Sequence, residues 1–187
     1  MGRIEDLAAK YQRHIAIPWQ RNLSGDQKTI FIVYPKSDER QVRVRMDTFA
    51  MATAKADHTW KLVDLTPVFA EWMAAEDYRE EYFEDPGALE MSLEHGFTEN
   101  VADRIRAQLL ANDVTEDSVV AVLGAGSLFG LTRLSLVLRH VINDVRGRLL
   151  LFFPGEYDNS NYRLLDARDG WNYLAVPITL HDGVTDQ

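Results

Sequence analysis

The sequence of 187 residues contains no cysteine. That absence excludes a disulfide framework, a thiolate nucleophile and a cysteine-ligated zinc site. No apolar run approaches the roughly 20 residues that a membrane-spanning helix requires. The N-terminal residues carry early acids in place of the apolar core of a secretory signal. We therefore expect a cytoplasmic protein that does not associate with a membrane.

Positive charge is scarce as well. Lysine and arginine number 20 against 29 aspartates and glutamates, which gives a net charge of −9. Proteins that bind the phosphates of double-stranded nucleic acid usually carry a net positive charge, so direct nucleic-acid binding is disfavoured. Basic residues do gather at 40–45 and among Lys10, Arg13 and Arg21, which leaves a DNA-contacting subunit as an open alternative.

Apolar residues make up 46% of the chain and aromatic residues 10%, enough for one sizeable core. This composition excludes an intrinsically disordered chain and predicts a single domain over residues 1–187. Periodicity predicts strands at 29–34, 60–65, 118–123, 148–153 and 173–179. Helical spacing predicts helices between them. The alternation predicts an α/β fold, with a mostly parallel sheet of about five strands flanked by helices.

Local signals predict where these elements begin and end. Ser37, Thr66 and Thr98 are each expected to cap a helix, and Pro67 suits the first position of the second of these helices. Pro154 and the glycine after it are expected to end the fourth strand. Residues 181–187 are expected to form a loose tail.

A glycine-rich turn at residues 124–130 joins the third strand to an apolar helix. Gly124 and Gly126 fit the start of a dinucleotide-binding fingerprint, but Phe129 stands where the third glycine belongs. The P-loop pattern of mononucleotide-binding proteins can also be laid on this turn. It places Leu131 where that pattern has its phosphate-binding lysine, and Thr132 where it has its magnesium-binding hydroxyl.

Because leucine supplies no cation to a phosphate, we interpret this turn as a degenerate P-loop and expect no catalysis there. Two alternatives stay open: a retained nucleotide or anion site, or a plain tight turn. The candidate anion-binding residues are Gly124, Gly126, Gly130, Thr132 and Arg133.

Motifs for other chemistry are absent from the sequence. The histidines lack the spacing of a helical zinc site, and no nucleophile elbow is present. Asp64 could hold a metal at the end of its strand, but fixing the turn before Thr66 is the simpler role. We predict neither a bound metal nor a cofactor.

Residues 71–99 form an acidic segment with ten acids and one base, Arg79, an excess equal to the net charge of the whole chain. We interpret this segment as a helical insertion that is either a solvated face or a docking face for a basic partner. Its candidate contact residues are Glu80, Glu81 and Glu84.

Residues 156–173 combine three tyrosines, a tryptophan, two arginines and three asparagines. Tyrosine, tryptophan and arginine dominate binding hot spots, so this segment is a second candidate partner surface. The alternative is an internally tied loop, with an arginine paired to Asp166 or Asp169. The candidate residues are Tyr157, Tyr162, Arg163, Arg168 and Trp171.

Two stretches resemble a known family. Residues 152–159 and 162–178, which include the run from Arg168 to Tyr173, resemble the C-terminal signature of the BrxB family. Residues 60–66, followed by Phe69, Trp72 and Met73, resemble its central motif. That family belongs to BREX, a bacteriophage-exclusion system of bacteria.

The resemblance implies a P-loop-like fold without an intact nucleotide site. It also implies a non-enzymatic accessory role, with the alkaline-phosphatase-like protein PglZ as the first expected partner and other BREX components as further ones. The family offers no catalytic residues to carry over. The resemblance thus implies an adaptor in phage defence that acts by protein–protein docking, and the glycine turn leaves a nucleotide- or anion-sensing domain as the alternative.

Overall fold

The computed structural model describes residues 2–167 and 170–181. Its core is a sheet with strand order β2-β3-β4-β1-β7. The strands on this path are β1 (Thr29–Tyr34), β2 (Thr59–Asp64), β3 (Ser118–Leu123), β4 (Arg148–Asp158) and β7 (Val176–Ile178). Two short strands, β5 (Asn161–Leu164) and β6 (Trp171–Asn172), extend the sheet beside β4.

The predicted α/β class is confirmed, and the sheet is mixed. All neighbouring strands on the main path pair in parallel. β4 runs beyond the parallel sheet, and its end pairs antiparallel with β5, which pairs antiparallel with β6. The prediction that Pro154 ends β4 is wrong: Pro154 still pairs with Tyr34, and Gly155 opposite Leu164 begins the antiparallel part.

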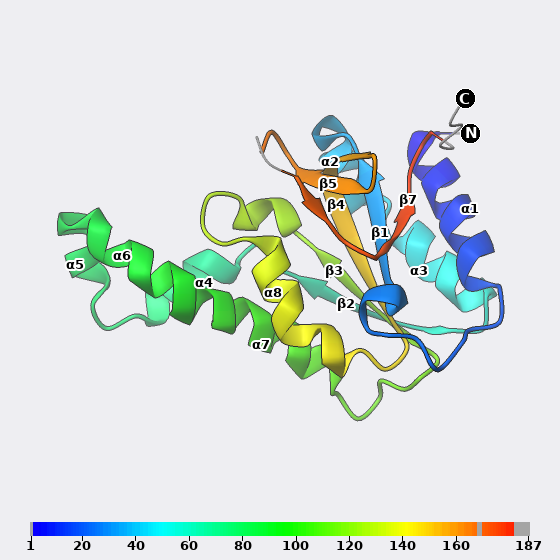
Figure 1. The fold of residues 1–187 in the computed structure, drawn as a ribbon, viewed down its shortest axis with the longest axis horizontal. Coiled ribbons are helices and arrows are strands. Elements are labelled where there is room, and N and C mark those ends of the chain that lie inside the picture. The colour runs from blue at the N-terminus through cyan, green and yellow to red at the C-terminus, as the bar shows by residue number, and fades with distance from the viewer. Residues whose placement is uncertain (1, 168–169, 182–187) are drawn as a thin grey trace.

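Helices cover both faces of the sheet (Figure 1). On one side lie α1 (Arg3–Ile15), α2 (Glu39–Val44) and α3 (Met46–Lys55). On the other lie α7 (Thr98–Leu109) and α8 (Leu134–Val141). Three further helices, α4 (Val68–Ala75), α5 (Arg79–Glu84) and α6 (Pro86–Ser92), belong largely to the acidic segment. Short 3₁₀ turns span Asp26–Lys28, Lys36–Asp38, Ala125–Leu128 and Ile142–Asp144.

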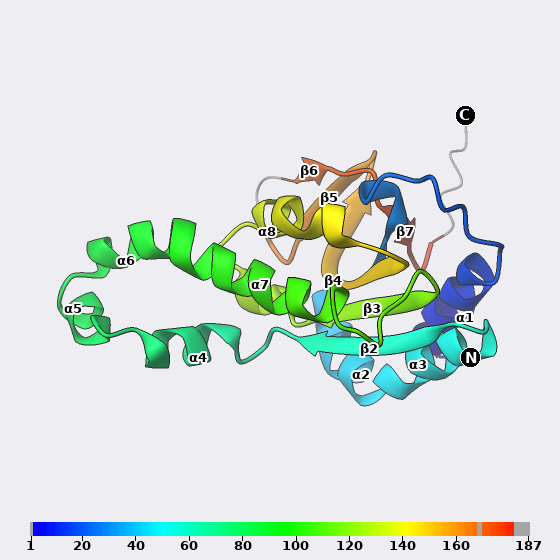
Figure 2. The same ribbon diagram turned by 90° about the horizontal axis from the view of Figure 1, so that it is seen from below.

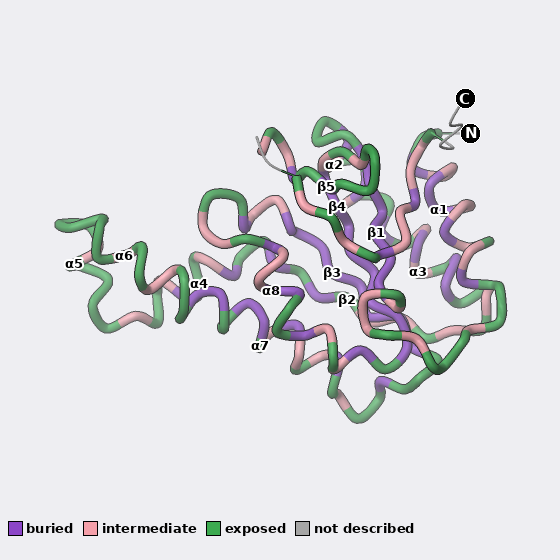
Figure 3. Tube along the Cα trace, viewed as in Figure 1, coloured by how far each residue is buried: buried purple, intermediate pink, exposed green. Residues whose placement is uncertain are grey.

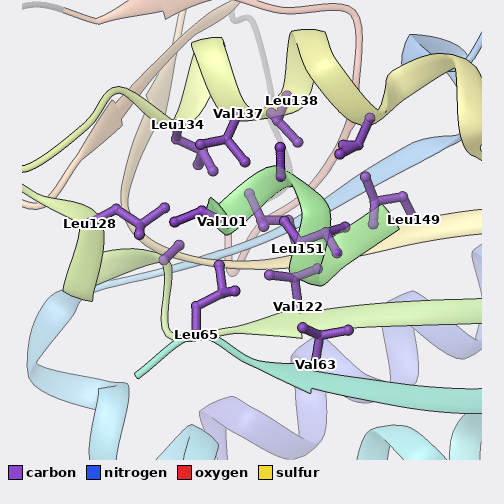
Figure 4. Close-up of a cluster of buried hydrophobic side chains, with 14 of the residues drawn as sticks. Val63, Leu65, Val101, Val122, Leu128, Leu134, Val137, Leu138, Leu149 and Leu151 are labelled. Carbon is purple, nitrogen blue, oxygen red and sulfur yellow. The ribbon is translucent and has the colours of Figure 1, made fainter. Parts of the chain in front are cut away.

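Each face of the sheet has its own hydrophobic core. Alternation along β1 divides its side chains: Ile30, Ile32 and Tyr34 pack toward α1 and α3, whereas Phe31 and Val33 pack toward α7 and α8. Because both faces are covered, all six residues of β1 and all six of β3 are buried. Figure 3 shows this buried centre, and Figure 4 shows part of the core beneath α8.

None of the three predicted helix caps forms. Ser37 lies in a 3₁₀ turn and makes no capping hydrogen bond. The Thr66 hydroxyl donates to Asp64 Oδ1 at 2.5 Å, and α4 begins at Val68 without a side-chain cap. Thr98 follows a π-helical turn, Leu93–Phe97, so its hydroxyl donates back to the Leu93 carbonyl at 3.0 Å. The Thr66 and Thr98 hydroxyls are thus engaged by Asp64 and by the Leu93 carbonyl, and Ser37 lies in a 3₁₀ turn that runs directly into α2.

The acidic segment projects from the body of the protein. α5 and α6 lie at the end farthest from the sheet in two perpendicular views (Figures 1 and 2). Trp72 anchors its base, since this buried ring lies 5.3 Å from the ring of Phe97. Within the described residues, no helix has the length and apolar character needed to cross a bilayer.

Candidate functional site

The parallel strands end at one edge of the sheet, where α/β proteins usually bind their ligands. Asp64 ends β2 there, and its Oδ1 accepts hydrogen bonds from the backbone N–H of Thr66 at 2.9 Å and from the Thr66 hydroxyl. Its other oxygen lies 3.8 Å from the Arg43 guanidinium. Asp64 therefore fixes the turn after β2, as the simpler of its two interpretations proposed.

Gly124 is the first residue of the glycine turn and lies against the turn after β2, which contains Asp64 and Thr66. Its φ of 89° lies in the left-handed region, which a residue with a side chain rarely adopts. A Cβ on Gly124 would lie 2.7 Å from the backbone nitrogen of Thr66. This glycine is required for close packing of two strand ends, whether or not a ligand binds.

The rest of the glycine turn differs from the expected strand-to-helix junction. A 3₁₀ turn, Ala125–Leu128, follows Gly124, and α8 begins only at Leu134. Thr132 thus lies before the helix, and its hydroxyl is 2.6 Å from the hydroxyl of Thr98. Arg133 stands at the position before the first residue of α8.

The structure brings the two candidate regions together around one cavity of about 370 Å³. Gly130, Thr132 and Arg133 line it from the glycine turn, and Trp171 lines it from the C-terminal segment. The indole Nε1 of Trp171 is buried and has no hydrogen-bond partner in the described part of the chain. Gly124 and Gly126 lie outside this lining, and Gly126 instead neighbours Pro154 and Leu165.

The C-terminal segment is a β-hairpin and not a long loop. β4 and β5 pair through Asp158 and Asn161, and the two residues between them have positive φ, 48° at Asn159 and 67° at Ser160. Two positive φ angles are typical of the turn that best joins twisted antiparallel strands. The Asn159-Ser160 pair, with Tyr157 before it and Tyr162 after it, was therefore an available signal for a hairpin that the sequence prediction missed.

Tyr162 does not belong to a surface. It is fully buried, its hydroxyl donates to the Ala175 carbonyl at 2.8 Å, and its ring lies 4.5 Å from that of Phe31. Burial raises the pKa of this hydroxyl, and the neighbouring Tyr157 raises it further. The hypothesis that Tyr162 contacts a partner is thus wrong, because the residue is the core of the hairpin.

The other candidate residues of the hairpin differ in how far they are buried and in which residues they contact. Tyr157 and Trp171 are half-buried, with rings 4.7 Å and 6.0 Å from that of Tyr162. Arg163 is exposed and donates to Glu156 at 2.7 Å, so its partner is neither of the two aspartates that the sequence suggested. Asp166 pairs with Lys36. Arg168 and Asp169 lie outside the described residues.

The acidic segment carries the most exposed candidates. Glu80, Glu81 and Glu84 all lie on α5 with exposed side chains. Large apolar side chains stand among them in the same segment. The exposed fractions are 62% for Tyr78, 73% for Phe83 and 73% for Met91.

A family model described as BREX protein BrxB matches residues 61–178. The chain belongs to the BrxB family. The matched range begins in β2 and ends in β7, so it contains the acidic segment, the glycine turn and the hairpin. Membership of the BrxB family makes the chain a component of a BREX phage-defence system. The search of curated proteins and the search of solved structures each found no match.

Proposed function

We propose that this BrxB-family chain is a non-catalytic, cytoplasmic adaptor that docks the PglZ-type protein into a BREX complex. Family membership supports the assignment to BREX and to partners among its proteins. The degenerate glycine turn supports a role without NTP hydrolysis, since Leu131 offers no cation to a phosphate.

The observation that carries the proposal is the surface of the acidic segment. Exposed apolar residues that gather in one place mark interaction sites more often than residues that are scattered singly. Here Tyr78, Phe83 and Met91 are exposed apolar side chains of the acidic segment, and the glutamates of α5 belong to the same segment. Such a surface suits a partner with an apolar cleft rimmed by basic residues, because the charges steer encounter and the anchors supply affinity.

The hairpin is a second docking candidate, with Arg163 as its most accessible residue. Trp171 is a poor probe of binding, because its ring packs 5.7 Å from Phe153 and close to Tyr162. A Trp171→Ala change would therefore damage folding and binding together. Arg163→Ala removes only an exposed ion pair, which contributes about 1 kcal/mol or less to stability.

The test is co-expression with the PglZ-type protein of the same system, followed by size-exclusion chromatography with light scattering. The proposal expects a co-eluting complex of defined mass that weakens at high salt. Phe83→Ala should weaken it at least tenfold, the loss typical of a binding hot spot, whereas Val44→Ala should leave it unchanged. Val44 is a matched control, since it is 77% exposed on a helix of the body.

Separate peaks for the two wild-type proteins would contradict the proposal that the PglZ-type protein is the partner of this chain. A complex insensitive to Phe83→Ala, yet weakened by Arg163→Ala, would move the docking surface from the acidic segment to the hairpin.

The cavity between the glycine turn and Trp171 supports a second candidate function, the sensing of a nucleotide or anion. Arg133 lines this cavity and has no carboxylate partner within the described ranges, and the ring of Trp171 forms part of the same lining. A ligand there should raise the melting temperature, and Arg133→Gln should abolish the rise. An unchanged melting temperature with ATP, GTP and dinucleotides would contradict this function.

A further inference from the structure

A small basic cavity lies at the opposite edge of the sheet, where the parallel strands begin. It has a volume of about 110 Å³ and is lined from loops and strand starts by Trp19, Lys28, His58, Arg146 and Arg148. Arg21, Glu116 and Asp117 stand in the same lining. This cavity shares no residue with the glycine-turn cavity.

Positive charge exceeds negative charge in this lining, although the chain as a whole carries a net charge of −9. Arg21 is neutralised by Glu116, 3.0 Å away. Lys28 lies near the backbone carbonyls of Val145 and Arg146, at 3.5 Å and 3.4 Å. Over the residues that the structure describes, no carboxylate forms an ion pair with Lys28, Arg146 or Arg148.

Arg148 is the central residue of the cavity. Only 8% of it is exposed, and its guanidinium lies 4.5 Å from the centre of the Trp19 ring. One of its N–H groups donates to the Gly147 carbonyl at 3.0 Å. A guanidinium has five N–H donors, and burying a cation without a counter-charge is unfavourable. Burial accordingly lowers the pKa of Arg148. The ring contact offsets part of this cost, and an anion would offset the rest.

The walls of the cavity are already in place. The Trp19 ring stacks on His58, with centroids 3.7 Å apart and planes 15° apart. His58 Nε2 donates to the Ile15 carbonyl at 3.1 Å, which leaves Nδ1 buried and without a partner among the described groups. Gly147 allows the backbone beside Arg148 to approach Ser118 closely, since a Cβ there would lie 2.1 Å from the Ser118 carbonyl oxygen. A binding site here would need little rearrangement.

We propose that this cavity binds a small, multiply charged oxyanion of the inorganic phosphate class, held by Arg148, Lys28 and Arg146. Several unpaired cations in one lining favour a dianion over a singly charged carboxylate. The volume excludes larger ligands, because sites for drug-sized molecules span roughly 300–1,000 Å³. The planar fork of a guanidinium matches the oxygens of such an ion. The proposal is independent of the docking function.

Isothermal titration calorimetry with inorganic phosphate at constant ionic strength tests this site. The wild-type chain should show saturable binding, and Arg148→Met should weaken it at least tenfold. Because Arg148 also packs on Trp19, Lys28→Gln provides a second variant that removes a charge without removing buried packing. Arg139→Gln is the control, since Arg139 is exposed on α8 outside the cavity lining.

Absence of saturable phosphate binding would overturn the proposal, as would binding that neither cavity variant weakens. An equal loss in Arg139→Gln would indicate a non-specific charge effect and would also overturn it. Titration with adenosine 5′-monophosphate tests whether the site takes free phosphate or the phosphoryl group of a nucleotide. The small cavity predicts that this nucleotide binds much more weakly than the free ion, and equal affinity with the same dependence on Arg148 would contradict the assignment to a free oxyanion.

Discussion

Gly124 illustrates how a single residue positions the candidate edge of the sheet. Its left-handed backbone and its contact with Thr66 together leave no space for a side chain. Gly130 has a similar φ of 78°, but no atom lies within 4 Å of the position its Cβ would take. Substitutions at the two glycines can therefore be compared, because a side chain at Gly130 would cost only backbone strain, whereas one at Gly124 would also overlap with Thr66.

We predict that Gly124→Ala destabilises the fold by about 2–4 kcal/mol, the sum of backbone strain and overpacking. Gly130→Ala should cost about 1 kcal/mol, from strain alone. Urea unfolding of both variants measures the difference. Equal costs would show that the overlap with Thr66 is relieved by movement of the turn.

The buried hydroxyl of Tyr162 gives a second prediction at this scale. Tyr162→Phe should lower the free energy of unfolding by about 1 kcal/mol, because it leaves the Ala175 carbonyl without its donor. Tyr78→Phe is the control, since Tyr78 is exposed. A cost no larger than that of the control would contradict the role of this hydrogen bond in holding the hairpin.

Among the elements, some could be predicted from sequence and others could not. β1 and β3 were predicted to the residue, because continuous β-prone runs define fully buried strands. The hairpin was missed, because a proline followed by glycine was taken as a stop where the strand only changes its partner from β1 to β5. The cavity beside Arg133 depends on contacts between distant segments, which spacing within one segment cannot reveal.

The acidic segment gives a prediction at the element scale. Replacing Glu80, Glu81 and Glu84 together with Gln should change the free energy of unfolding by less than about 1 kcal/mol. The favourable position of Glu80 and Glu81 in the first turn of α5 is offset by repulsion among the exposed acids. The same variant should weaken docking of a basic partner.

Trp72→Ala provides the contrast in a thermal melt, with an expected cost of about 3–5 kcal/mol, because Trp72 anchors the base of the segment in the core. If the triple Gln variant were as unstable as Trp72→Ala, the glutamates would have a structural role and not a docking role.

Across the whole molecule, buried tyrosines set the response to alkali. Burial raises the pKa of Tyr11, Tyr34, Tyr162 and Tyr173 above the usual value near 10. The unfolded chain releases these protons near pH 10, whereas the folded chain retains them. Their contribution to stability is therefore fully present below about pH 10 and is lost as the pH rises above it.

We predict a steep fall in the free energy of unfolding above about pH 10, measured by urea unfolding across the alkaline range. Tyr34→Phe should make the fall shallower, because it removes one of the four groups with a raised pKa. A profile that stays flat beyond that pH would contradict the burial of these hydroxyls.

At the scale of the whole molecule, the proposed function depends on docking through the acidic segment. The most direct test is the dissociation constant between this chain and the PglZ-type protein, measured for the wild type and for a Phe83→Ala, Met91→Ala double variant. We predict measurable wild-type binding that weakens with salt, and a loss of at least tenfold in the double variant with an unchanged melting temperature. No wild-type binding, or equal affinity in the two proteins, would contradict it.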